Sequence, residues 1–224
     1  MKWIDRRGRR ICLSGLRHDE YGLLQIRPEL VESFVDIGAN CGVMSRLALR
    51  LFPRAHVYAV EPTPQTYDCL VENLADDRCT TLRAALGNGK EFGRHAARTS
   101  VAVLYEPLST ADPVPSYRLP GLLNHFGVNP ETAIIKIDAE GAEEWLLDHR
   151  TTRAAIRKCV AVVGELHRGE RPTMLPFINW GASFSYTHLF SYRPGRKQIM
   201  ASFSMVRKDA IIPPPWLDLI EELR

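Results

Sequence analysis

The stretch between residues 33 and 62 constrains the fold of this chain more than any other part of it. It opens with a short apolar run, Ser33–Ile37, that leads into a glycine-bearing turn, as is typical of a buried parallel strand. From residue 43 the apolar residues recur with helical spacing until Pro53, and a second apolar run, His56–Val60, follows. The predicted order is therefore strand, tight turn, helix and strand.

Acids stand near the ends of both predicted strands, and two glycines lie in the turn between strand and helix. Asp36 belongs to the first strand, and Glu61 follows the second. Gly38 and Gly42 lack a β-carbon, so a ligand can lie against the backbone of the turn. An acid at the end of the second strand, about 20 residues beyond the glycines, is placed to bond the hydroxyls of a ribose. Together with Asn40 in the same turn, these residues predict a ligand site.

The glycine spacing excludes the usual dinucleotide pattern. Three residues separate Gly38 from Gly42, so the sequence reads D-I-G-A-N-C-G and lacks G-x-G-x-x-G. No lysine stands in the turn to bind a phosphate. An acid suits a ligand that carries an amino group and a sulfonium charge better than it suits a pyrophosphate. A nicotinamide-dependent oxidoreductase, which would share the sheet, is therefore disfavoured.

Strand and helix patterns alternate along the rest of the chain, which indicates an α/β fold. Helices are predicted from Pro64 and at 119–126, and strands at 80–84, 133–137, 160–166, 184–192 and 198–206. Such alternation gives a doubly wound, Rossmann-like fold with right-handed crossovers. We predict a mostly parallel, seven-stranded sheet with a C-terminal antiparallel hairpin.

Ligands of such sheets bind beyond the carboxyl ends of the strands. The side chains predicted there are Asp36, Glu61, Asp138, Glu165 and His167. Lys136 lies within a predicted strand, so we expect it to pair with an acid or to lie at an edge of the cleft. Glu143, on the helix predicted after that strand, is either a salt-bridge partner or a substrate contact.

The composition does not indicate a nucleic-acid or membrane partner. There are 29 Lys and Arg against 26 Asp and Glu, and the net charge of +3 is too small to require nucleic acid. Five scattered cysteines without C-x-x-C spacing indicate reduced thiols in a cytoplasmic protein. No apolar stretch approaches the roughly 18 residues of a membrane span. We expect a small-molecule partner and no membrane, and the oligomeric state is left open.

Three motifs follow one another in the chain: V-D-I-G-A-N-C-G-V-M-S with V-E-P, then I-I-K-I-D-A-E-G-A-E, then G-E-L-H. In order and spacing they resemble the FkbM family of S-adenosylmethionine-dependent methyltransferases, over about residues 33 to 167. The resemblance implies a class I methyltransferase fold, S-adenosylmethionine as cofactor, and O-methylation of a hydroxyl group on a sugar or natural product. Cys41 stands where the family commonly has an aliphatic residue.

The resemblance also implies a domain division. Residues 33–210 would form the methyltransferase domain, residues 1–32 an N-terminal extension that could cover the cofactor crevice, and residues 211–224 a C-terminal tail. The residues implied to hold the cofactor, some of them by their place beside the motif, are Asp36, Gly38, Ala39, Asn40, Gly42, Ser45, Glu61, Pro62 and Asp138.

The candidate catalytic residues are His167, Asp138 and Glu140, at the same ends of the sheet. His167 is preferred as the general base that removes the proton of the acceptor hydroxyl, because an unperturbed histidine pKa lies near neutrality. Asp138 would orient the acceptor or the base. A competing hypothesis gives Asp138, Glu165 and His167 a shared divalent ion. The metal-free version is preferred, so no metal ligand is assigned.

Two other functions are weighed against O-methylation. A methyltransferase that modifies amino groups of RNA would be expected to carry an Asn/Asp-Pro-Pro-aromatic motif after the fourth strand, where this chain has D-A-E-G. A non-catalytic cofactor-binding module of a biosynthetic assembly would share the cofactor site but transfer no methyl group. A binding titration followed by a methyl-transfer assay separates these alternatives.

Overall fold

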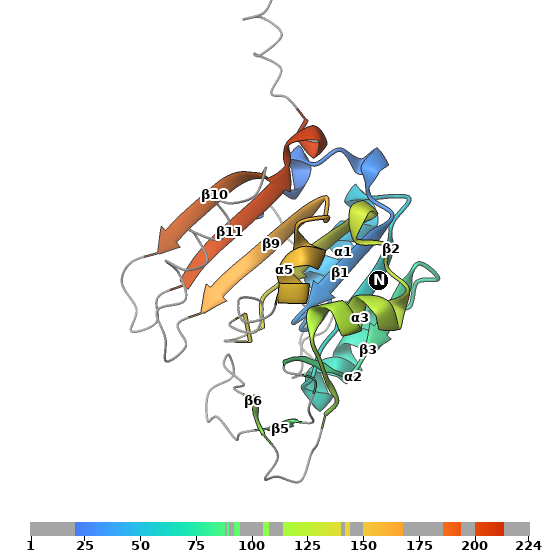
Figure 1. The fold of residues 1–224 in the computed structure, drawn as a ribbon. Coiled ribbons are helices and arrows are strands. Elements are labelled where there is room, and N and C mark those ends of the chain that lie inside the picture. Colours follow the sequence, from blue (N-terminus) through green and yellow to red (C-terminus); the bar gives the residue numbers. More distant parts are fainter. Residues whose placement is uncertain are drawn as a thin grey trace, which may run out of the picture.

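Seven strands form one sheet in the order β10-β11-β9-β8-β1-β2-β3 (Figure 1). The computed structural model describes residues 21–87, 89, 92–94, 105–107, 114–139, 142–143, 150–167, 186–193 and 200–212. The strands of the main sheet are β1 (Ser33–Ile37), β2 (His56–Val60), β3 (Cys79–Leu82), β8 (Ala133–Ile137), β9 (Ala161–His167), β10 (Tyr186–Arg193) and β11 (Met200–Arg207). The α-helices are α1 (Val43–Leu51), α2 (Pro64–Asn73), α3 (Leu119–Phe126) and α5 (Arg150–Ile156).

The first strand occupies the centre of the sheet. β1 pairs in parallel with β2 on one side and with β8 on the other, and β3 and β9 continue the parallel pairing outward. β11 runs antiparallel to both of its neighbours, β9 and β10. The predicted seven-stranded, mostly parallel sheet with a C-terminal hairpin is confirmed, as is the Rossmann-like fold class.

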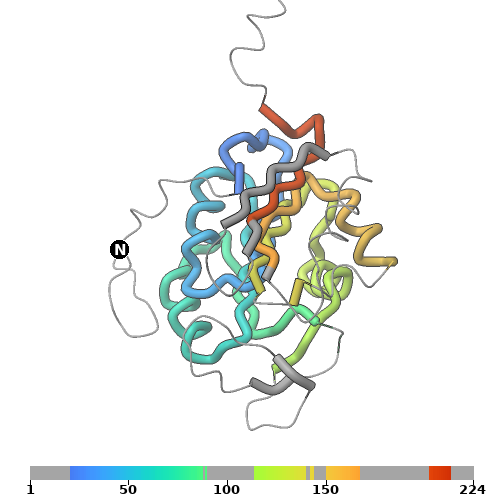
Figure 2. The backbone as a smooth tube through the Cα atoms, turned by 90° about the vertical axis from the view of Figure 1, so that its left-hand side faces the viewer, coloured from blue at the N-terminus to red at the C-terminus, as the bar shows by residue number. Residues whose placement is uncertain are grey.

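Helices cover both faces of the sheet, as a doubly wound fold requires. Helices α3 and α5 pack on the face that carries Val35 and Ile135, whereas α1 and α2 pack on the face that carries Phe34 and Ile134. Figure 2 views the sheet from the side, with α1 and α2 (blue to teal) on the left and α3 and α5 (green to orange) on the right. The five residues of β1 are all buried, because both of its faces are covered.

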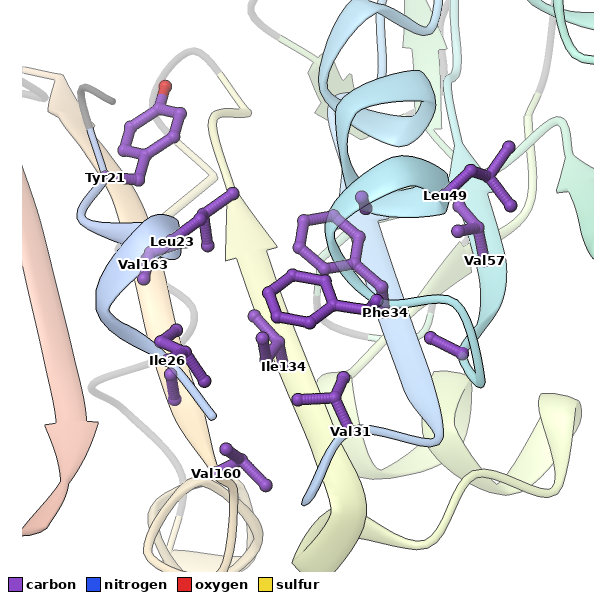
Figure 3. Close-up of a cluster of buried hydrophobic side chains, with 14 of the residues drawn as sticks. Tyr21, Leu23, Ile26, Val31, Phe34, Leu49, Val57, Ile134, Val160 and Val163 are labelled. Carbon is purple, nitrogen blue, oxygen red and sulfur yellow. The ribbon is translucent and has the colours of Figure 1, made fainter. Parts of the chain in front are cut away.

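The segment that precedes β1 belongs to this core. Tyr21, Leu23, Ile26 and Val31 are buried among residues of β1, β2, β8 and β9 on the α1 side of the sheet (Figure 3). The same segment bridges to Ile211, just beyond the last strand. Residues 21–31, which the sequence assigned to an N-terminal extension, thus pack on the central strands. Residues 1–20 lie outside the described part of the chain.

Other elements differ from the sequence-based prediction in detail. The third strand is Cys79–Leu82, and residues 83 and 84 follow it without strand structure. Glu143, expected to belong to the helix after β8, lies in a turn, and residues 144–149 lie outside the described ranges. Short strands β4 (Ala85–Leu86) and β7 (Ser116–Tyr117) form a parallel pair, and β5 (Phe92–Arg94) pairs antiparallel with β6 (Tyr105–Pro107). Of the helices described, none has the length and apolar character to cross a bilayer.

Candidate functional site

The turn after β1 is held in a shape that few sequences can adopt. Gly38, Asn40 and Gly42 all have positive φ angles, of 76°, 51° and 88°. The amides of Gly38 and Ala39 both donate to the carbonyl of Val60, at 2.9 and 3.0 Å, so the turn is tied to the end of β2. The side-chain oxygen of Asn40 accepts a hydrogen bond from the Cys41 amide at 2.8 Å, which stabilises the left-handed residue locally.

Neighbouring protein atoms crowd both glycines. A β-carbon on Gly38 would lie 1.8 Å from the carbonyl oxygen of Asp138, and one on Gly42 would lie 2.9 Å from a methyl carbon of Leu70 in α2. The sequence interpretation explained these glycines by ligand access. The structure adds a second reason, which is that the loop after β8 and helix α2 approach the turn closely.

Glu61 joins the end of β2 to the turn after β1. Its Oε2 accepts a hydrogen bond from the Asn40 amide at 3.1 Å, and its Oε1 accepts one from the Thr63 amide at 2.9 Å. The residue is 7% exposed. Burial raises the pKa of Glu61, although the hydrogen bonds from Thr63 and Asn40 and the charge of Lys136 act in the opposite direction. Pro62 follows it, half-buried, two residues before α2 begins.

Asp36 lies beneath the turn. Its side chain is 0% exposed, and its Oδ2 accepts a hydrogen bond of 2.7 Å from the Ser45 hydroxyl of α1. Its Oδ1 is ion-paired with the Lys136 ammonium at 3.1 Å. Asp36 and the buried Ser45 therefore lie at the predicted place, but they contact protein groups and support the turn from below.

Of the two alternatives expected for Lys136, pairing with an acid is the one observed. Its ammonium lies 3.1 Å from Asp36 and 3.8 Å from the Oδ2 of Asp138, and it donates a 3.0 Å hydrogen bond to the Gly38 carbonyl. Asp138 itself has a side chain 29% exposed and is the more accessible acid at this position.

The loop after β8 is fixed by a buried acid. The Oε1 of Glu143 accepts a 2.7 Å hydrogen bond from the Ala139 amide, and Glu143 is 1% exposed. The Asp138 amide donates to the Ile37 carbonyl at 3.0 Å, which ties this loop to the end of β1. Glu143 thus shapes the loop that carries Asp138.

The remaining candidates follow β8 and β9. Ile137 pairs with Gly164, so Asp138 and Glu165 are the next residues on adjacent strands. His167 is the last residue of β9 and pairs with Met200 of β11, but its side chain lies outside the described part of the structure, as does all of Glu140. Within the described ranges, no three His, Cys, Asp or Glu side chains come together in a group that could hold a metal ion.

One contributor to the turn carried no signal in the sequence. The buried side-chain amide of Asn73, at the end of α2, donates a 2.9 Å hydrogen bond to the Cys41 carbonyl. A polar residue in a helical pattern is normally assigned to the solvent face, so spacing alone did not mark Asn73. The four described cysteines form no disulfide, and burial raises the pKa of Cys79 and Cys159 to about 12.

Similar folds occur among solved structures. The chain is similar to the crystal structure of methyltransferase FkbM from Methylobacillus flagellatus KT, with 18% sequence identity and a TM-score of 0.50, over 78% of this chain and 44% of that one. It is also similar to precorrin-6y C5,15-methyltransferase from Geobacter metallireducens GS-15, with 13% identity and a TM-score of 0.47, over 80% and 81% of the two chains. Among curated proteins, none matches the sequence.

At 18% sequence identity, the likeness to the Methylobacillus flagellatus structure shows only that the two folds are similar. The family is shown by the sequence itself: the model of the methyltransferase FkbM domain matches residues 36–186, more than half of the chain. The matched range begins at Asp36 and includes the turn, Glu61 and the loop after β8. The chain therefore belongs to the FkbM family of methyltransferases.

Proposed function

We propose that this methyltransferase binds S-adenosylmethionine at the carboxyl ends of β1, β2 and β8 and methylates a hydroxyl group of a sugar or natural product. The observation that carries the proposal is the anchoring of Glu61. One hydrogen bond from a backbone amide reaches each of its two carboxylate oxygens. The side chain of Thr63 also hydrogen-bonds to this carboxylate, which offers about four acceptor positions in all, so the fixed carboxylate can still accept from a hydroxyl of a ribose.

The charges around the turn suit a cationic ligand. Three acids, Asp36, Glu61 and Asp138, lie around the turn together with Lys136, whose ammonium is 3.1 Å from Asp36 and 3.8 Å from Asp138. Bound S-adenosylmethionine would supply a methyl group on a positively charged sulfur, together with an ammonium group. Two carboxylates at the edge of a low-dielectric site attract such a ligand more strongly than they would in water.

The acceptor chemistry follows from the residues near β8 and β9. An oxygen acceptor is proposed because the loop after β8 reads D-A-E-G where amino-group methyltransferases would be expected to carry Asn/Asp-Pro-Pro-aromatic. A hydroxyl is a weak nucleophile and must lose its proton as the new bond forms. His167 is proposed to take that proton, with Asp138 and Glu140 orienting the acceptor. Alignment of the acceptor oxygen with the methyl carbon would provide much of the rate.

Calorimetric titration with S-adenosylmethionine and S-adenosylhomocysteine tests the cofactor site. Replacing Glu61 with alanine removes a charged acceptor that contributes roughly 1.5 to 3 kcal/mol, so affinity should fall about tenfold or more. The matched control is Glu32→Ala, which removes an exposed glutamate whose partner Arg54 lies 3.4 Å away. The control should bind as the wild type does. If a folded Glu61→Ala protein binds S-adenosylmethionine and S-adenosylhomocysteine as tightly as the wild type does, Glu61 does not belong to the cofactor site.

A further inference from the structure

Lys136 occupies an unusual place for a lysine. It lies within β8, opposite Asp36 of the central strand, and its side chain is 3% exposed. Burial by itself lowers the pKa of Lys136, but the charges of Asp36 and Asp138 more than reverse this effect, and the pKa is raised. A buried ammonium is tolerated because acids surround it.

The ammonium has three donors, and three oxygen-bearing groups lie around it, two within hydrogen-bond distance and one at ion-pair distance. These are the Gly38 carbonyl at 3.0 Å, Asp36 at 3.1 Å and Asp138 at 3.8 Å. Gly38 and Lys136 are 98 positions apart in the sequence. The contacts therefore join two loops that the chain builds separately, the turn after β1 and the loop after β8.

The two loops meet at one crowded point. The Asp138 carbonyl lies where a β-carbon of Gly38 would be, and the Asp138 amide bonds to Ile37. The Gly38 carbonyl accepts from Lys136, so the orientation of this peptide depends on the ammonium. The Asp138 carboxylate, the more exposed of the two acids, lies against the same charge.

We propose that Lys136 is a positioning residue of the methyl-transfer site: its ammonium fixes the cofactor turn and the Asp138 carboxylate relative to one another. This inference rests on the proposed function, because it assigns Asp138 and the turn to one ligand. Lys136 need not touch that ligand. It acts through the Gly38 carbonyl, which belongs to the turn, and through Asp138, whose carboxylate is the more exposed of the two acids.

The test separates positioning from simple neutralisation of Asp36. In Lys136→Met the Asp36 carboxylate is left buried without its cation, so thermal stability should fall, and the affinity for S-adenosylhomocysteine should fall with it. The double variant Lys136→Met/Asp36→Asn removes both charges, and its stability should recover much of the loss. Its affinity for S-adenosylhomocysteine should nevertheless stay at least tenfold below that of the wild type, because Gly38 and Asp138 still lack the ammonium.

The control is Lys158→Met, which removes an exposed lysine 3.9 Å from Glu131 and should change neither quantity. A double variant with both stability and affinity at the wild-type level would overturn the positioning role and leave the cofactor assignment intact. A wild-type protein that binds neither S-adenosylmethionine nor S-adenosylhomocysteine would overturn the proposed function and this inference with it. If Lys136→Met fails to fold, the double variant alone decides the outcome.

Discussion

Gly38 is the residue at which the two loops of the site come closest. Its φ of +76° strains any other residue, and an added β-carbon would lie 1.8 Å from the Asp138 carbonyl oxygen. Gly127 offers a matched control, because it has a φ of +66° but open space around the position of a β-carbon.

We predict that Gly127→Ala loses about 1 to 2 kcal/mol of unfolding free energy from backbone strain alone. Gly38→Ala should lose roughly 1 to 3 kcal/mol more, since the backbone of the loop after β8 must move to make room. Urea unfolding of both variants measures the difference. Equal losses would mean that the approach of the two loops is not the reason for a glycine at position 38.

Glu61 leads to a prediction about pH. Burial raises its pKa above the ordinary glutamate value. The folded protein therefore takes up a proton at Glu61 at a higher pH than the unfolded chain does, and the stability gained from a protonated Glu61 is lost as the pH rises through the folded pKa. Ligand binding instead requires the ionised form of Glu61, because only the ionised carboxylate keeps all of its acceptor positions.

Affinity for S-adenosylhomocysteine should therefore decline on acidification, and the decline should begin above the pH at which an exposed glutamate titrates, about 4.3. Calorimetric titrations across pH test this, with Glu61→Gln as the variant that cannot ionise. The variant should bind more weakly and with a flatter pH dependence. A wild-type affinity that stays constant down to the ordinary glutamate range would contradict the raised pKa or the role of Glu61.

At the scale of elements, helix α2 is more than a cover for the sheet. Its last residue, Asn73, donates to the Cys41 carbonyl, and Leu70 lies against Gly42. The turn is thus bonded to α2 through Asn73 and to β2 through Val60. Asn73→Ala leaves a buried carbonyl without its donor, a loss of about 1 to 3 kcal/mol.

We expect Asn73→Ala to weaken S-adenosylhomocysteine binding as well as to lower the midpoint of urea unfolding. Glu72→Ala is the control on the same helix, since Glu72 is exposed. It should leave the binding constant unchanged and the midpoint within experimental scatter. If Asn73→Ala unfolds more readily but binds normally, the contact stabilises α2 without shaping the turn.

The elements that the sequence predicted well share a clear local signal. β1, α1 and β2 follow from a change of apolar period around a glycine turn, and each keeps both its type and its position. The packing of residues 21–31 could not be predicted, because short 3-10 turns give no period and their burial depends on distant strands. Helix α5 was missed for a related reason, since only Thr152 and Ile156 of its seven residues are buried.

The candidate site shows the same limit. Glu61 and the turn were predicted from spacing, because their chemistry is local to one strand-turn-helix unit. That Lys136 would pair with an acid was one of two predicted alternatives, which rested on the cost of burying a lone charge. The hydrogen bond from Lys136 to the Gly38 carbonyl could not be predicted, because this bond depends on which strands are neighbours and on their register.

At the scale of the whole molecule, the strand order brings Glu61, Lys136 and Asp138 to one turn. β8 and β2 flank β1, so the residues after these strands emerge at one edge of the sheet although the sequence separates them widely. Glu61 reaches the turn from β2 and Lys136 reaches it from β8. The proposed methyl-transfer site is thus a product of topology, and no single segment contains it.

The most direct test follows the methyl group itself. The protein is incubated with S-adenosylmethionine carrying a labelled methyl group and with a panel of hydroxylated sugars and natural products, and the labelled atom of the product is located by mass spectrometry and NMR. We predict that the label is recovered as a methyl ether on an acceptor oxygen. Label recovered on a base nitrogen of RNA or on a protein lysine would contradict the account.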